Sequence, residues 1–141
     1  MFVVQRCSSP YVVPMYGWHP MDPSGPAFIV CAYMQHRDLW TALRLFHKTG
    51  SGPLKEGWTV RARLALDVAS GLAHLHARNV VHNDIASRNV LLGEGFRARL
   101  GDFGSAETLE TLRKTDTDKE VAKEIANAVR CIVFPLLLFR C

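Results

Sequence analysis

Residues His82–Asn89 read HNDIASRN, and the tripeptide DFG follows at Asp102–Gly104. Together they supply an acid at Asp84, an amide five positions later at Asn89, and a second acid thirteen positions beyond that at Asp102. Magnesium-assisted phosphoryl transfer uses such groups. One carboxylate accepts the proton of the attacking hydroxyl, while an amide oxygen and a second carboxylate hold the metal ions that bridge the phosphates. The pattern therefore predicts a phosphoryl-transfer site.

These two segments resemble the catalytic loop and the metal-binding motif of eukaryotic protein kinases. Roughly eight positions are fixed in type, each matched by chance about once in twenty, and the separation of the motifs also fits. Upstream, Leu66–His76 (LDVASGLAHLH) is similar to tyrosine-kinase-like sequences, and Ala27–Leu39 resembles the fifth strand and hinge of the family. The resemblance covers residues 1 to about 104.

The resemblance implies a role for each residue of the catalytic motifs. Asp84 would be the catalytic base, Asn89 would hold one Mg²⁺, and Asp102 would hold the ions that bridge the phosphates of ATP. Arg88, four residues after Asp84 as in tyrosine kinases, would neutralise charge on the transferred phosphoryl group. Its position favours tyrosine-kinase or tyrosine-kinase-like ancestry and leaves open whether the acceptor is Tyr or Ser/Thr. His82 is expected to be structural.

The resemblance also implies an ATP pocket. Cys31 would be the gatekeeper, Ala32 and Met34 would offer hinge backbone groups to adenine, Asp38 would meet the ribose, and Leu91 would form the apolar floor. For Cys31 we expect a plain buried thiol rather than a reactive one, because no cation lies nearby in the sequence.

Hydrophobic patterning predicts the elements around these motifs. Two strand-like runs, 11–16 and 27–33, flank a turn rich in Gly and Pro and predict an antiparallel hairpin. Asp38 can cap a helix that ends near Phe46. A longer helix over Val60–His76 is predicted from apolar residues spaced four, four, four and three apart, namely Val60, Leu64, Val68, Leu72 and Leu75. Arg61, Arg63 and Asp67 lie off this stripe.

Further along the chain, the patterning predicts a hairpin and a last helix. The hairpin joins 90–92 to 98–101 around the glycine-containing turn 93–95. The helix spans about 118–134, with Asp118 as its cap. Its expected buried face consists of Val121, Ile125, Val129 and Ile132.

The predicted fold class is α+β, a truncated protein-kinase-like fold. It would contain a remnant of the small-lobe antiparallel sheet, the first helices of the helical lobe and the catalytic loop. We expect a partial kinase domain over residues 1–104, from the end of the regulatory helix to the DFG motif. Residues 105–141 are expected to form a diverged or truncated tail with the last helix.

The sequence departs from the family pattern in ways that bear on activity. The 141 residues contain no Gly-rich phosphate loop and no Lys in a Val-Ala-Ile-Lys context, and the partner Glu of that Lys would fall before Met1. Asn83 replaces the Arg that usually receives a phosphorylated activation-loop residue, and no Ala-Pro-Glu follows Gly104. We therefore expect weak or no phosphoryl transfer from this chain.

Composition excludes several other classes of protein. An apolar content of 48% with 21% charged residues is typical of a folded domain, and the cations behind the net charge of +4 are scattered, so no nucleic-acid partner is expected. Four cysteines without short spacing indicate free thiols in a reducing, cytoplasmic compartment. The apolar run 132–139 falls short of the roughly 20 residues that span a bilayer, so we expect no membrane insertion.

The sequence thus predicts a protein kinase that takes ATP with Mg²⁺ and a protein substrate. A pseudokinase-like nucleotide-binding or scaffolding module is the alternative. A gene-model fragment without a stable fold is a third reading, because a truncated sheet leaves an open edge.

Overall fold

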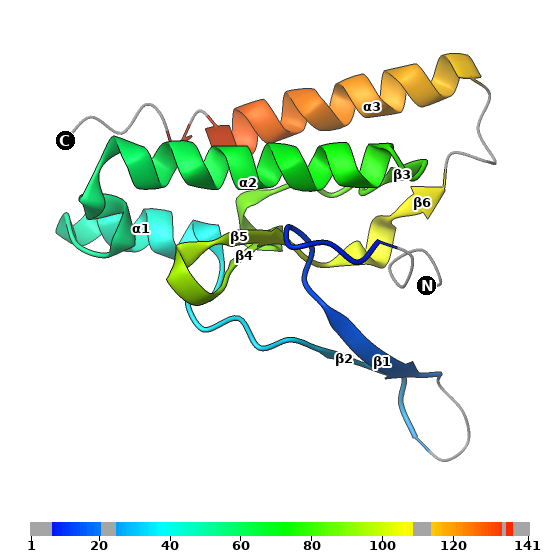
Figure 1. Ribbon diagram of the computed structural model, residues 1–141, viewed down its shortest axis with the longest axis horizontal. Coiled ribbons are helices and arrows are strands. Elements are labelled where there is room, and N and C mark those ends of the chain that lie inside the picture. Colours follow the sequence, from blue (N-terminus) through cyan, green and yellow to red (C-terminus); the bar gives the residue numbers. More distant parts are fainter. Residues whose placement is uncertain (1–6, 21–24, 109–113, 134, 137–141) are drawn as a thin grey trace.

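The computed structural model describes residues 7–20, 25–108, 114–133 and 135–136. It confirms the α+β class, with short antiparallel strands beside helices. Helix α2 (Trp58–His76) and helix α3 (Lys114–Ala128) run side by side over the short strands, and α1 (Leu39–Thr49) lies at one end (Figure 1). Within the described ranges, no helix combines the length and apolar character that crossing a membrane requires.

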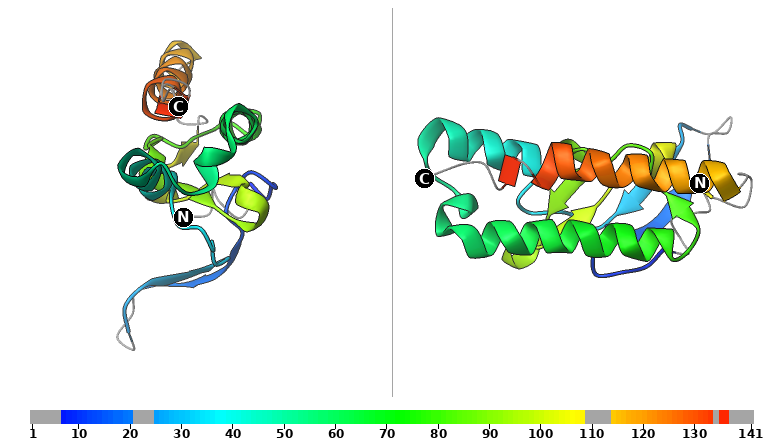
Figure 2. Two further views of the ribbon diagram at one scale, coloured as in Figure 1. Left: turned by 90° about the vertical axis from the view of Figure 1, so that its left-hand side faces the viewer. Right: turned by 90° about the horizontal axis from the view of Figure 1, so that it is seen from above.

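Strands β1 (Met15–His19) and β2 (Phe28–Cys31) form the predicted antiparallel hairpin, which projects away from the rest of the molecule (Figure 2). The first strand begins later than predicted. The Leu100 N–H donates to the Tyr11 carbonyl at 2.8 Å, and the Val13 N–H donates to the Leu100 carbonyl at 2.9 Å. Backbone groups that the sequence pattern assigned to the hairpin therefore bond to another strand.

Helix α1 confirms the predicted Asp38 cap, since the Thr41 N–H donates to the Asp38 carboxylate at 2.8 Å. The helix runs to Thr49 rather than ending near Phe46. It stops where Gly50, at φ +63°, supplies the left-handed conformation and donates its N–H to the Phe46 carbonyl. A 3-10 turn, η2 (Pro53–Glu56), then leads into α2.

Helix α2 buries the whole predicted apolar stripe. Arg61 and Asp67 lie off that stripe but are also buried, at 3% and 1% exposure. The reason is that η2 and β5 (Ala98–Leu100) pack on α2 beside the stripe and supply polar partners. The helix is therefore enclosed over a wider arc than its hydrophobic pattern indicates.

The short strands and turns around the predicted motifs come next along the chain. The hairpin predicted at 90–101 is confirmed as β4 (Val90–Leu92) and β5, with the 3-10 turn η4 (Glu94–Phe96) between them. Strand β3 (Val80–Val81) pairs with β6 (Glu107–Thr108). Two further 3-10 turns, η3 (Ser87–Asn89) and η5 (Phe103–Ser105), carry parts of the catalytic and DFG motifs.

The last helix differs from its prediction in start and in facing. Helix α3 begins at Lys114, so Asp118 lies inside it, and it continues as a π-helical turn, η7 (Val129–Val133). Ile125 and Val129 are 49% and 40% exposed. Ile132, also part of the predicted face, is buried as expected, and it shares a buried stripe with Glu124 and Ala128, spaced four apart. A hydrogen-bonded glutamate occupies a buried position, which apolar periodicity does not detect.

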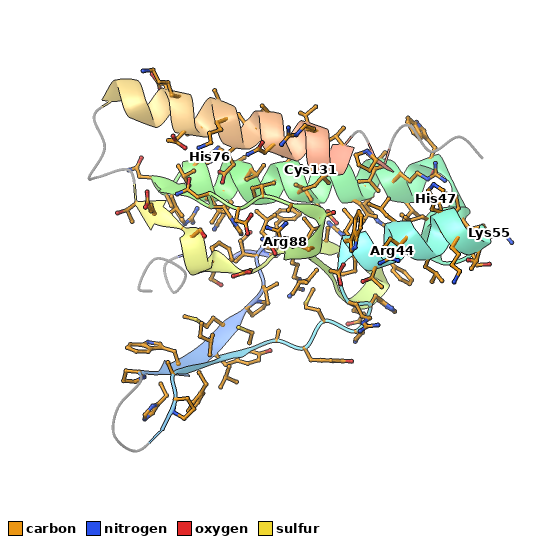
Figure 3. All side chains as sticks on the ribbon, turned by 180° about the vertical axis from the view of Figure 1, so that it is seen from behind. Arg44, His47, Lys55, His76, Arg88 and Cys131 are labelled. Atoms are coloured by element: carbon orange, nitrogen blue, oxygen red, sulfur yellow. The ribbon has the colours of Figure 1, made fainter. Side chains whose placement is uncertain are left out.

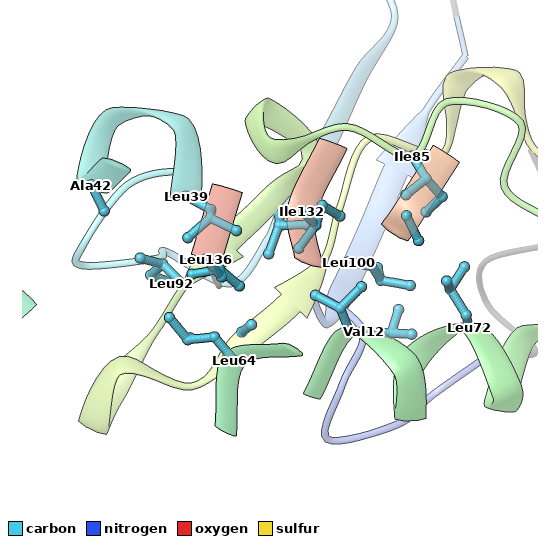
Figure 4. Close-up of a cluster of buried hydrophobic side chains, with 14 of the residues drawn as sticks. Val12, Leu39, Ala42, Leu64, Leu72, Ile85, Leu92, Leu100, Ile132 and Leu136 are labelled. Atoms are coloured by element: carbon cyan, nitrogen blue, oxygen red, sulfur yellow. The ribbon is translucent and has the colours of Figure 1, made fainter. Parts of the chain in front are cut away.

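The core joins α1, α2, the β4–β5 hairpin and the C-terminal segment, by which we mean residues 128–133 and 135–136 (Figure 4). Ile132 and Leu136, both with no exposed surface, pack in the same cluster as Leu39 and Leu92. Side chains from beyond residue 104 therefore help to form the core of the kinase-like part. The division of the chain at residue 104 stays a prediction.

A substitution pair on α2 tests this core. Leu64→Ala should lower the free energy of unfolding by about 2 to 5 kcal/mol, because a side chain that is 1% exposed leaves a cavity. Leu66→Ala, on the open face of the same helix, should change it by less than about 0.5 kcal/mol. Urea unfolding followed by circular dichroism measures both. Equal losses would contradict the packing, and a wild-type chain without a cooperative transition would support the unstable-fragment reading.

Candidate active site

The catalytic loop is held to the DFG segment by His82, which is fully buried. Its Nε2 lies 2.8 Å from the Gly101 carbonyl, so this nitrogen donates, and its ring lies 4.7 Å from the Phe103 ring. The structural role predicted for His82 agrees with these contacts. The resemblance to protein kinases also implies that Val4 and Met15 stack with these two rings. Met15 lies with Phe103 in the wall of one cavity, and Val4 is outside the described residues.

Asp84, Arg88 and Asn89 come together as a hydrogen-bonded cluster. Arg88 Nη2 donates to both Asp84 carboxylate oxygens, at 2.7 and 2.8 Å. Asn89 Nδ2 donates to the Asp84 main-chain carbonyl at 2.8 Å and to Asp84 Oδ2 at 2.9 Å. Because the amide nitrogen of Asn89 faces Asp84, its oxygen is the end that remains for a cation. Asn89 is buried, whereas Arg88 is largely exposed.

The cluster sets the charge of the Asp84 carboxyl. The hydrogen bond from Arg88 is the main cause that lowers the pKa of Asp84. Partial burial of the carboxyl raises this pKa, and the hydrogen bond from Asn89 lowers it further. Asp84 is therefore ionised at neutral pH and can accept a hydrogen bond from a substrate hydroxyl.

This pKa gives a test by NMR titration. In Arg88→Gln the Asp84 carboxyl should titrate at higher pH than in the wild type, because its main stabilising donor is gone. The folded pKa lies below the unfolded one. The resulting stability is thus fully present above the unfolded pKa and is lost as pH falls through the folded pKa. Carbon-13 shifts of the Asp84 carboxyl measure the midpoint. An unchanged midpoint in the variant would contradict the assignment.

Asp102 is exposed and adopts a left-handed conformation at φ +56°. Its carboxylate accepts the Gly104 N–H at 3.4 Å. The preceding residue, Gly101, donates its N–H to the Asn89 carbonyl at 2.9 Å, which brings the start of the DFG motif beside the catalytic loop. An amide oxygen and a carboxylate from adjacent segments are hard oxygen donors. Mg²⁺ accepts such donors when phosphate oxygens and water complete its shell, so the residues fit that ion.

A cavity of about 430 Å³ extends from β2 to the DFG segment. Four residues predicted for ATP binding line it: Cys31, Ala32, Leu91 and Asp102. Its size is typical of small-molecule sites, and Asp102 provides a charged group in an otherwise largely apolar wall. The remaining lining residues are Val13, Met15, Ile29, Gly101, Phe103, Gly104 and Ala106.

Two other residues predicted for ATP binding do not line this cavity. The side chain of Met34 packs against Gly93. Both carboxylate oxygens of Asp38 accept hydrogen bonds from Thr41, one from its N–H and one from its hydroxyl, each at 2.8 Å. The Asp38 carboxylate, which was predicted to bind the ribose, is thus already engaged in capping α1.

The hinge backbone is partly bonded within the chain. The Ala32 N–H donates to the Pro14 carbonyl at 2.8 Å, and the Met34 carbonyl accepts the Arg37 N–H at 3.3 Å. The groups that these two bonds leave for an adenine base are the Ala32 carbonyl and the Met34 N–H. The expected burial of Cys31 is wrong. The thiol is exposed because β2 belongs to a two-stranded sheet and is exposed along its whole length.

Sequence reasoning missed a clasp formed by Asn83 and Glu124. The Asn83 N–H donates to Glu124 Oε1 at 2.8 Å, and the Asn83 side chain donates to the Ser105 carbonyl at 3.1 Å. Glu124 is 3% exposed, and its other oxygen lies 2.6 Å from His76 Nε2. The clasp joins α2, α3, the catalytic loop and the DFG segment. The one signal in the sequence is Asn83 itself, because Asn tolerates the left-handed φ of +64° found there.

The structure places a nucleotide-sized cavity at Asp102 of the DFG motif. The neighbouring catalytic loop holds the cluster of Asp84, Arg88 and Asn89. This combination is typical of a phosphotransferase of the protein-kinase type. The family model for protein tyrosine and serine/threonine kinases matches residues 1–128, and the chain belongs to this family.

Curated proteins with similar sequences are also protein kinases. The chain is 35% identical over 140 residues to the leucine-rich repeat receptor protein kinase MSL1 of Oryza sativa subsp. japonica, covering 93% of this chain and 9% of the relative. It is 33% identical over 112 residues to the probable serine/threonine-protein kinase PBL28 of Arabidopsis thaliana, covering 76% and 28%. It is 46% identical over 67 residues to the dual specificity testis-specific protein kinase 1 of Mus musculus, covering 45% and 11%. The chain thus spans a minor part of each relative.

Proposed function

We propose that this chain belongs to an enzyme that transfers the γ-phosphoryl group of ATP, with Mg²⁺, to a Tyr, Ser or Thr hydroxyl of a protein. The observation that carries the proposal is the hydrogen-bonded cluster of Asp84, Arg88 and Asn89. The Asn89 carbonyl accepts the N–H of Gly101, the residue before Asp102. Asp102 in turn lines a nucleotide-sized cavity.

Each side chain has a task in this reaction. The ionised Asp84 orients the substrate hydroxyl and accepts its proton. The exposed Arg88 guanidinium balances the negative charge that develops on the transferred group. Asn89 and Asp102 would hold Mg²⁺, which when bound neutralises the phosphate oxygens. The backbone of Ala32, which lines the cavity together with Leu91, would meet adenine.

We further propose that transfer by this polypeptide alone is weak or absent. Its 141 residues contain neither the Gly-rich loop nor the Val-Ala-Ile-Lys lysine that clamp the phosphates in the family. A nucleotide-binding, pseudokinase-like module is the second candidate, favoured by the same lack of a phosphate clamp in these 141 residues. The cytoplasmic location and the absence of a nucleic-acid partner stay predictions.

Isothermal titration with ATP, with and without Mg²⁺, tests the nucleotide site. We expect Mg²⁺-dependent binding that Asp102→Asn weakens about tenfold or more, since one metal-holding carboxylate is lost. The control Asp118→Asn, on the exposed surface of α3, should bind as the wild type does. An ATP affinity that changes neither on removal of Mg²⁺ nor in Asp102→Asn would contradict the proposal.

Transfer of radiolabelled γ-phosphate to a generic protein substrate tests the chemistry. We expect little or no label above background. Robust transfer that disappears in Asp84→Asn would overturn the proposed impairment and favour the kinase over the pseudokinase-like module.

A further inference from the structure

A second and larger cavity, of about 690 Å³, shares no described lining residue with the predicted nucleotide site. It lies between α1, the turn η3 of the catalytic loop and the C-terminal segment. We propose that this cavity docks an acidic segment of the protein substrate, with an apolar side chain inside and carboxylates at the rim. This inference rests on the proposed function, because it places the segment next to the phosphoryl-transfer site.

The charge of the lining is the first argument. Arg44, His47 and Lys48 line the cavity, and the described residues of its lining include no Asp or Glu. In the part of the chain that the structure describes, neither Arg44 nor Lys48 has an ion-pair partner. Figure 3 shows Arg44 and His47 on α1, with Cys131 and Arg88 on the neighbouring segments. Arg44 and Lys48 are cations that no described carboxylate neutralises, and such cations attract a segment of the opposite charge.

The apolar part of the lining is the second argument. Trp40, Leu43 and Leu45 of α1 face the cavity, together with Pro135, and Trp40 is 52% exposed. Trp40 and Arg44 are one helical turn apart, and the guanidinium lies 6.0 Å from the ring centroid. An apolar hollow with cations at its rim fits a peptide that combines an aliphatic side chain with carboxylates.

Placement is the third argument. Ser87 lines this cavity and opens the turn that carries Arg88 and Asn89. A segment bound here would therefore lie a few residues from the hydroxyl that Asp84 orients. Stabilisation of the α1 C-terminus by cations explains His47 and Lys48, which lie in the last turn. It does not explain Arg44, a turn earlier, or the exposed Trp40.

Fluorescence anisotropy without ATP tests the proposal. The probe is a short labelled peptide with one Ser flanked by Glu and Leu, and its counterpart carries Lys in place of each Glu. The wild-type chain should prefer the Glu peptide, and added salt should weaken the binding. The double variant Arg44→Glu/Lys48→Glu should lose about tenfold or more of this affinity, and Arg44→Gln/Lys48→Gln should lose part of it.

The matched control is Lys55→Glu/Lys119→Glu, which reverses two charges outside the cavity and gives the same net charge. It should bind the Glu peptide nearly as the wild type does. Equal binding of the two peptides, or equal losses in the cavity variant and the control, would overturn the proposal. Because ATP is absent, this failure is distinct from loss of Mg²⁺-dependent nucleotide binding, which would overturn the proposed function.

Discussion

Replacing Arg97 with methionine should lower the free energy of unfolding by about 2 to 3 kcal/mol, at or below the low end of the range for breaking a buried ion pair, because Asp67 is buried but the Arg97 side chain is 49% exposed. The Arg97 guanidinium donates to both oxygens of Asp67, at 2.6 and 2.9 Å. Asp67 is 1% exposed, and the same pairing raises the pKa of Arg97. Without Arg97, the Ala98 N–H at 3.0 Å is the donor to that carboxylate that remains among the described residues. The variant therefore leaves a buried charge without its counter-charge.

Urea unfolding measures this loss, with Arg130→Met as the control for removing an exposed arginine. The control should differ from the wild type by less than about 0.5 kcal/mol. The double variant Asp67→Asn/Arg97→Met should recover part of the stability, because the unpaired charge is then absent. An Arg97 variant as stable as the control would show that the pair contributes little.

Replacing Glu124 with alanine should have the second large effect, a loss of about 2 to 4 kcal/mol. The variant removes the acceptor for the Asn83 N–H and the partner of His76 from a buried position. The effect should also be local, since Asn83 immediately precedes Asp84. We expect the Asn83 amide to exchange its hydrogen much faster, while amides of the β4–β5 hairpin keep their relative protection.

Glu120→Ala is the matched control, one turn earlier on α3, where the carboxylate forms a surface pair with Lys123 at 3.2 Å. It should change stability by less than about 0.5 kcal/mol. Glu124→Gln keeps an acceptor oxygen and should protect the Asn83 amide partly. If Asn83 exchange is the same in the wild type and in Glu124→Ala, the clasp does not hold the catalytic loop.

The predictions from sequence succeeded where local rules decide the structure. The apolar spacing of Val60, Leu64, Val68, Leu72 and Leu75 gave α2 and its buried stripe. They failed where distant segments supply partners. The Tyr11 carbonyl accepts a hydrogen bond from β5 rather than from the β1–β2 hairpin. On α3, Glu124 takes a buried position because it accepts a hydrogen bond from Asn83. Neither partner is visible in local periodicity.

The site divides in the same way. The resemblance to protein kinases identified the residues that the structure brings together in the catalytic loop, Asp84, Arg88 and Asn89. For Asp38, the helix-capping role predicted from local rules is confirmed, and that role occupies the carboxylate which the resemblance assigned to ribose. The exposure of Cys31 depends on what covers β2, which no local pattern contains.

We propose that Asn89 and Asp102 hold a divalent cation at the end of the candidate nucleotide cavity. Paramagnetic Mn²⁺ in place of Mg²⁺ tests it by NMR, because the ion broadens the resonances of nearby nuclei. With ATP present, we predict broadening of the Asn89 side-chain amide and of the Asp102 and Gly104 amides, and its loss in Asp102→Asn. Unaffected resonances at these three residues, or broadening that persists in the variant, would show that Asn89 and Asp102 do not hold the ion.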